Sequence, residues 1–241
     1  RPGPDAGPGA GGGGAPDGGA IGDEPGDGSY DLAVVDGGDW TFWEYANLNS
    51  VMTTAPGVWT WTSTVIAGDT INAETLADFD VLVVADDARG YVTHQMQDDV
   101  HAWVRAGGVL IIAPVHGDAG TEPLLSCFGA DFRVDWSGGE WCDAPLLIDP
   151  AHPLVSAPNP LLDPAQFDPC WHVSADPATL GGAWRVAVAT DTGAVVLASA
   201  GAGRGGVSIA GTHWAHNLVA QRHLAENLIT HRFEPGAEVL E

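Results

Sequence analysis

Short apolar runs alternate with helically periodic segments over most of the chain from Tyr30 onward. Runs that are apolar at every position, such as VLVVA at residues 81–85 and VLIIA at residues 109–113, are typical of parallel strands covered on both faces. The runs predict strands at residues 30–35, 58–64, 81–85, 109–113 and 207–210. Strands that alternate with helices in this way predict an α/β fold with a mostly parallel central sheet.

Four helices are predicted from apolar residues that recur at helical spacing. They cover residues 42–52, 93–106, 121–128 and 217–230. In the second, Thr93 is a suitable N-cap, and Gly107 and Gly108 stop the helix after its last turn.

The periodicity breaks down in residues 130–180, which are rich in Trp, Pro, Asp and Gly and predict an irregular insertion. After it, apolar runs at residues 184–189 and 195–199 flank an Asp-Thr-Gly turn and predict a C-terminal β-hairpin. We therefore expect one folded domain over residues 29–234 and a tail at 235–241, whose final Leu-Glu we interpret as a cloning remnant.

Residues 1–28 consist almost entirely of Gly, Pro, Ala and Asp, with Ile21 as their only large apolar residue. Such a segment buries too little apolar surface to offset the entropy of ordering, so we predict a disordered tether. Tethers of this kind commonly separate an export signal or lipid anchor from a domain at a bacterial surface. We expect an extracytoplasmic protein (periplasmic, lipid-anchored or secreted), and the start at Arg1 suggests that the chain has been trimmed.

The net charge is −24, from 32 acidic residues and 8 basic residues that are all arginine. This field repels phosphate backbones and anionic lipids, so we expect no nucleic-acid partner. No apolar run approaches the roughly 20 residues of a membrane helix, so we also expect no membrane span. The acidity indicates solubility, salt tolerance or cation binding, and a biased coding composition explains the missing lysine equally well.

Four segments carry a resemblance to a known family: DFDVLVVADD, VHAWVRAGGVLIIAPVHGD, HPLV and GRGGVSIAGTHWAHNLVAQRHLAENLITH. Together they resemble the class I glutamine amidotransferase-like superfamily, with the trehalose-utilisation-type and gliding-accessory-type branches as the nearest. In those branches a helix that ends in Gly-Gly precedes the central strand, and a Gly-rich hairpin precedes a final helix. The resemblance implies a flavodoxin-like three-layer sandwich over most of residues 30–233.

The superfamily's amidotransferases place a nucleophilic Cys directly after the strand that corresponds to residues 109–113. Here the sequence continues Pro114-Val115-His116-Gly117 and offers neither Cys nor Ser. The resemblance therefore implies a member that lacks the nucleophile, and glutaminase or peptidase chemistry by that route is not expected. The trehalose-utilisation-type branch often carries a His at this point, which His116 matches.

Polar residues follow the predicted parallel strands, at the edge where such sheets bind ligands. We expect these ten to form a ligand-binding rim: Asp36, Asp39, Trp40, Asp86, Asp87, His116, Asp118, Thr212, His213 and His216. The metal candidates among them are Asp36, Asp86, His116 and His213, since carboxylates and imidazoles bind divalent cations. The alternative is that the Asp residues cap helices and turns while the His residues are solvated, and we expect no obligatory cofactor.

His213 and His216 lie three residues apart, which puts two imidazoles on one helical face if the last helix begins early. His116 and His213 are the candidates for a general base. For the His213 and His216 pair, an equally good interpretation is that a helix begins here and His216 is simply a polar residue of its first turn. The remaining histidines are placed on surface helices or in the insertion and receive no role.

Ten tryptophans are present, of which Trp103 and Trp184 are predicted to lie in the core. The others fall near predicted loops or exposed strand faces: Trp40, Trp43, Trp59, Trp61, Trp136, Trp141, Trp171 and Trp214. Indole rings stack on sugars and favour interfaces, which suggests a carbohydrate or a surface protein as partner. The alternative is that they fill an insertion poor in secondary structure.

Three cysteines make an odd count. Cys127 lies in an apolar helix and is predicted to be a buried free thiol. Cys142 and Cys170 lie in the loop-rich insertion, and in an exported protein we expect them to form a disulfide worth roughly 3 to 4 kcal/mol.

Three functions remain open. The first is a non-catalytic, exported binding or scaffold domain with the amidotransferase-like fold. The second is a metal-assisted hydrolase or lyase that acts on a sugar-like substrate through the rim carboxylates and either His116 or His213. The third is a cation-storing acidic surface protein.

Overall fold

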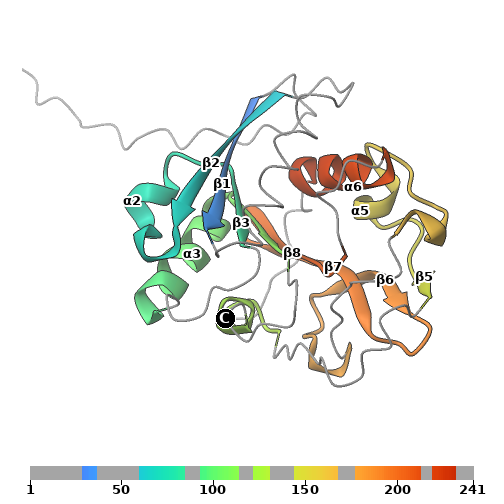
Figure 1. Ribbon diagram of the computed structural model, residues 1–241. Coiled ribbons are helices and arrows are strands. Elements are labelled where there is room, and N and C mark those ends of the chain that lie inside the picture. Colours follow the sequence, from blue (N-terminus) through green and yellow to red (C-terminus); the bar gives the residue numbers. More distant parts are fainter. Residues whose placement is uncertain are drawn as a thin grey trace, which may run out of the picture.

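One eight-stranded sheet organises the chain in the computed structural model (Figure 1). The structure describes residues 29–36, 60–84, 93–113, 122–130, 144–167, 177–212 and 219–231. The strands lie in the order β2-β1-β3-β4-β8-β7-β6-β5. The predicted mixed α/β fold with a mostly parallel sheet is therefore confirmed.

The first five strands in this order are parallel and form the larger part of the sheet. They are β1 (Ser29–Asp36), β2 (Thr60–Ala67), β3 (Val81–Val84), β4 (Val109–Ile112) and β8 (Gly205–Ala210). Numbered by their succession along the chain, these five follow the order 2-1-3-4-5 of flavodoxin-like sheets. All residues of β3 and β4 are buried, which explains why their sequences are apolar on both faces.

Three antiparallel strands extend the sheet beyond β8. They are β7 (Val195–Ala202), β6 (Arg185–Thr190) and the short edge strand β5 (Pro145–Leu147). Strand β5 comes from the middle of residues 130–180, where the sequence predicted irregular structure. A strand of three residues is too short to show an alternating pattern, so periodicity did not reveal it.

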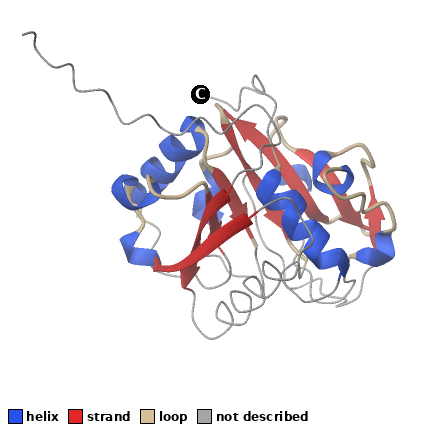
Figure 2. Cartoon of the chain, turned by 90° about the horizontal axis from the view of Figure 1, so that it is seen from above, coloured by secondary structure: helices blue, strands red, loops and turns tan. Residues whose placement is uncertain are grey.

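Helices cover both faces of the sheet (Figure 2). One face carries α2 (Ala73–Leu76), α3 (His94–Ala106) and α4 (Glu122–Ser126), and the other carries α5 (Pro153–Ser156) and α6 (Val219–Thr230). The described segments also contain single 3-10 turns at Gly68–Thr70, Pro164–Gln166 and Pro177–Thr179. None of the described helices is long and apolar enough to cross a bilayer.

Helix α3 begins and ends where the sequence predicted. The Thr93 hydroxyl accepts a hydrogen bond from the Met96 amide at 3.1 Å, which satisfies one free N–H of the first turn. Gly107 follows the last helical residue with φ of 130°, a conformation that a side chain disfavours. Between these ends, Met96, Val100 and Val104 are buried against the sheet.

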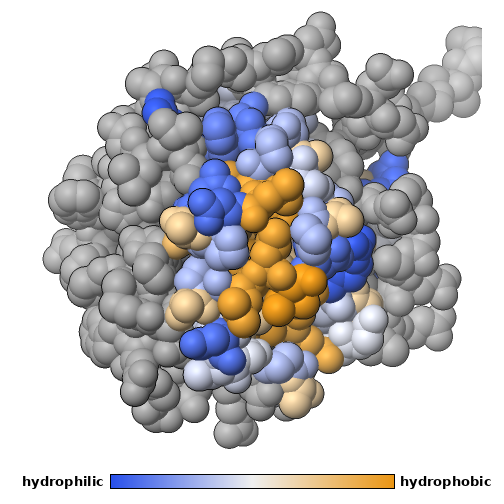
Figure 3. All heavy atoms as spheres, turned by 90° about the vertical axis from the view of Figure 1, so that its right-hand side faces the viewer, coloured by the Kyte–Doolittle hydropathy of each residue, from blue (hydrophilic) through white to orange (hydrophobic). Residues whose placement is uncertain are grey.

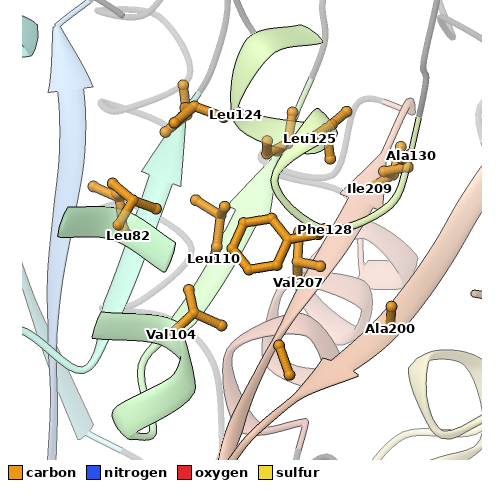
Figure 4. Packing of buried hydrophobic residues seen from close by; sticks show 14 of the residues in the cluster. Leu82, Val104, Leu110, Leu124, Leu125, Phe128, Ala130, Ala200, Val207 and Ile209 are labelled. Atoms are coloured by element: carbon orange, nitrogen blue, oxygen red, sulfur yellow. The ribbon is translucent and has the colours of Figure 1, made fainter. Parts of the chain in front are cut away.

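Phe128 and Trp184 close the core on the α3 side. Phe128 is fully buried and belongs to the same cluster as Val104, Leu110 and Val207 (Figure 4). The Trp184 indole N–H donates to the Phe128 carbonyl at 2.9 Å, which satisfies the polar atom of a ring that is otherwise buried. The predicted core position of Trp184 is confirmed, whereas Trp103 is only partly buried against this cluster.

Candidate functional site

The carboxyl ends of four parallel strands lie side by side at one edge of the sheet. The register aligns Val34 of β1 with Val83 of β3, and it carries Ile112 of β4 against Ile209 of β8. Each strand therefore ends beside its neighbour at the same edge. In sheets of this kind the edge formed by the carboxyl ends binds ligands, because loops leave the strands there.

Two of the predicted rim residues lie in the described part of the chain. Asp36 is the last residue of β1, and Thr212 follows the end of β8 by two residues. The other eight lie outside the described residues: Asp39, Trp40, Asp86, Asp87, His116, Asp118, His213 and His216. Their convergence stays a prediction, and among the described residues no group of three His, Cys, Asp or Glu side chains is arranged to hold a metal.

Thr212 has an unusual environment for a polar side chain. It is only 3% exposed, and its hydroxyl has no hydrogen-bond partner within the described structure. A buried hydroxyl without a partner costs about 1–3 kcal/mol, so proteins rarely leave one without a reason. A polar group that reached the end of β8 would satisfy it.

Cys127 follows α4 and is the one cysteine that falls within the described segments. It is a free thiol, packed in part against the core cluster on the α3 side. Burial raises its pKa above the usual range, which lowers the thiolate fraction at neutral pH. The prediction of a free thiol is confirmed, although its side chain is half-buried rather than fully enclosed. Cys142 and Cys170 lie outside the described residues.

A second group of buried polar residues lies under α5 and α6, where the sequence assigned no role. His152 is 1% exposed and is the N-cap of α5, with Nδ1 accepting the Leu154 amide N–H at 3.2 Å. Its Nε2 lies 3.3 Å from the Ser199 hydroxyl, and its ring centroid lies 6.2 Å from that of His231. His231 is also buried, so its placement on a surface helix was wrong.

The His152 and Ser199 pair resembles a base beside a nucleophile, but its hydrogen bonds run in the opposite direction. Because Nδ1 accepts an amide N–H, the neutral ring carries its proton on Nε2 and donates it toward Ser199. Burial, with a smaller contribution from Arg185, lowers the pKa of His152 to about 4, against an opposing effect of Asp149. His152 is therefore a weak base whose Nε2, the atom that faces Ser199, already carries a proton, so it is not arranged to take the Ser199 proton, which argues against a hydrolytic pair.

Asn227 ties this region to α6 through all of its amide groups. Its side-chain NH₂ donates to the carbonyls of Leu154 at 3.0 Å and Asn159 at 2.8 Å. Its carbonyl oxygen accepts the Asn159 amide N–H at 2.9 Å, and the Asn159 side chain donates to Glu226 at 2.7 Å. The Asn227 side chain is buried with its hydrogen bonds satisfied, while Asn159 is partly buried, as expected of groups that fix one chain segment on another.

No known protein family model matches the sequence, and no curated protein matches it either. Solved structures do share its fold. A protein from Thermoplasma acidophilum that is assigned as part of a GMP synthase superposes with a TM-score of 0.54 at 14% identity, over 83% of this chain and 92% of that one. A ThuA-like protein from Bacteroides uniformis gives a TM-score of 0.53 at 9% identity, over 84% and 89% of the two chains. At these identities the likeness shows a shared fold and nothing about activity.

Proposed function

We propose that this chain is a binding module of the amidotransferase-like superfamily that takes a polyhydroxyl ligand, such as a carbohydrate, at the carboxyl edge of its sheet. The observation that carries the proposal is the Thr212 hydroxyl, which is buried and unpartnered at the end of β8 within the described structure. A ligand hydroxyl is both donor and acceptor, so it matches a threonine hydroxyl in either role.

The tryptophans support a sugar as the ligand. Trp40 follows the last residue of β1 by four positions, and Trp214 follows the last residue of β8 by the same number. Both strands end at the edge where Thr212 lies. Indole faces beside hydroxyl partners are the combination that binds sugar rings.

Acyl transfer through a thiol does not fit this chain. That reaction needs a thiol or hydroxyl just beyond the central strand, beside a base and facing backbone N–H donors. Pro114 and Val115 supply neither nucleophile, and Pro114 also removes an N–H. A reaction at this edge would have to activate water through a metal or through His116 or His213, which is the competing proposal of a metal-assisted hydrolase or lyase.

The test compares Thr212→Val with Ser208→Ala. Ser208 is a matched control because its hydroxyl is also buried and, among the described residues, unpartnered on β8, but in the interior of the strand. We expect a mono- or disaccharide from a screened panel to bind the wild type in saturation-transfer NMR. We further expect Thr212→Val to weaken it about tenfold and Ser208→Ala to leave it unchanged, since one hydrogen bond contributes about 1.5 kcal/mol.

Two outcomes would count against this proposal. Equal weakening by both substitutions would show that Thr212 acts only through stability, and the absence of any saccharide binding would remove the ligand class. A stoichiometric divalent ion that survives dialysis, together with turnover lost in His116→Ala or His213→Ala, would favour the hydrolase instead.

We further propose that the domain works outside the cytoplasm on its tether of residues 1–28. The composition of the tether supports this placement, and so does the position of Cys142 and Cys170 in a loop-rich region. The two proposals are independent, because the ligand site does not require export.

A further inference from the structure

Residues 144–167 are attached to the rest of the fold by the pairing of β5 with β6, by a small number of polar contacts and by four buried apolar residues, Leu154, Val155, Leu161 and Phe167. Strand β5 pairs only with β6 among the described strands, and α5 packs on α6 through the Asn227 network. Asp149 adds an ion pair with Arg185 at 2.7 Å, although both side chains are partly exposed. His152 provides the one buried polar link from this segment to β7 within the described structure.

The outer surface of this segment carries an apolar patch bordered by hydrophilic residues (Figure 3). Leu146, Ile148 and Leu162 are 44%, 54% and 54% exposed and account for three of the four exposed large apolar residues in the described chain. Its inner surface is also apolar, because Leu154 and Val155 belong to the core cluster under α6. Movement of the segment away from α6 would therefore expose Leu154 and Val155 in addition to the residues already exposed.

His152 holds the segment only while its ring is neutral. Protonation gives both ring nitrogens an N–H, so Nδ1 can no longer accept the Leu154 amide proton that caps α5. The new N–H would face another N–H inside the protein. The segment would lose its cap and gain a buried charge in one step.

Among the charged groups around His152, Asp149 favours the protonated ring, but burial and Arg185 outweigh its effect. Asp149 on the same segment already accepts from Arg185 and from the Ala151 amide at 3.0 Å. Arg185 on β6 repels a cation, and Glu226 on α6 is bonded to Asn159. His231, which follows α6, is also buried, with its ring centroid 6.2 Å from that of His152.

We propose that residues 144–167 form a flap that opens in mildly acidic surroundings, with protonation of His152 as the trigger. The segment moves away from α6 and exposes its inner apolar residues, while the parallel part of the sheet stays folded. This device is separate from the ligand edge and does not depend on the proposed function.

The expected size of the effect follows from the two protonation equilibria. The pKa of His152 falls from 6.5 to about 4 in the closed flap, whereas an open flap leaves the ring near its ordinary value. The open state thus binds the proton more readily, so opening is suppressed above pH 6.5 and favoured as the pH falls toward 4. Linkage predicts about 30-fold more opening at pH 5 than at pH 7.5, and about 300-fold more once both states are protonated.

Hydrogen exchange read by mass spectrometry tests the proposal, with rates corrected for the intrinsic effect of pH. Between pH 7.5 and pH 5, we expect amides of residues 145–161 to lose protection about 30-fold in the wild type. His152→Asn keeps an oxygen that caps α5 but does not titrate, so its loss should stay under about threefold. His94→Asn, at an exposed position at the start of α3, is the matched control and should behave like the wild type.

Several results would overturn the flap. They are an unchanged wild type, an equal loss in His152→Asn, and a loss that extends equally to α3 and β4. A titration of the histidine ring signals by NMR in the wild type needs no variant and decides the matter even if His152→Asn does not fold. A His152 signal that titrates near 6.5 in the folded protein removes the trigger.

Discussion

Replacing Asn227 by leucine should detach the segment of α5 from α6 without creating a large cavity, since the two side chains differ little in size. Asn227 is fully buried, and its side chain satisfies three backbone groups: the carbonyls of Leu154 and Asn159 and the Asn159 amide. Each group left unpaired in the interior costs about 1–3 kcal/mol. Part of that cost is recovered because Asn159 is only partly buried and water can reach it. We expect Asn227→Leu to lower the free energy of unfolding by about 3–5 kcal/mol.

Equilibrium unfolding in urea, followed by circular dichroism, measures this change. Thr230→Val is the matched control on the same helix, because the Thr230 hydroxyl donates to the Glu226 carbonyl of its own helix at 2.7 Å. We expect the control to lose less than about 1 kcal/mol. A similarly small loss for Asn227→Leu, with an unchanged dependence on urea concentration, would refute the view that this network holds α5 in place.

Three further outcomes are expected. Gly203 has φ of 63°, and a Cβ added there would lie 2.6 Å from the Arg105 carbonyl oxygen. Gly203→Ala should therefore lower the free energy of unfolding by at least about 1–2 kcal/mol in the same urea assay. An unchanged stability would contradict the close contact. The raised pKa of Cys127 should make its modification by a thiol reagent slow at pH 7.5 and still accelerating above pH 9, whereas a rate that levels off near neutral pH would show an activated thiolate. Mass mapping under non-reducing conditions should link Cys142 to Cys170, and three reactive thiols in folded protein would argue against both the bridge and export.

The parallel strands and α3 could be predicted because their signals are local. VLVV at β3 and VLII at β4 are apolar at every position, which only a strand buried on both faces requires. Thr93 and Gly107 mark the ends of α3 through hydrogen bonding and backbone conformation within a single turn. Strand β5 and helix α5 could not be predicted in this way, because elements of three and four residues are too short to establish either pattern.

The polar site under α5 could not be predicted because its contacts are distant in sequence. His152 meets Ser199 across 47 positions, and Asn227 meets Asn159 across 68. Nothing within a few residues of His152 indicates that it will be enclosed, although Pro153 after it suits the first position of a helix. At the edge formed by the carboxyl ends of the parallel strands, the strand ends could be predicted from the sequence. The burial of Thr212 could not, because it depends on packing between segments that are distant in sequence.

The position of β8 in the sheet has a consequence for how this protein is made. Strand β8 is the last strand of the sheet in chain order, yet it lies between β4 and β7 in the middle of the sheet. Until the ribosome reaches Gly205, β4 has no partner strand along the edge that later pairs with β8. Its side chains, which are all buried in the folded protein, are apolar on both faces. Such an edge invites pairing with other chains until its partner is synthesised. Formation of the central sheet must therefore wait until β8 has been synthesised, and the many acidic charges would keep the waiting chains apart.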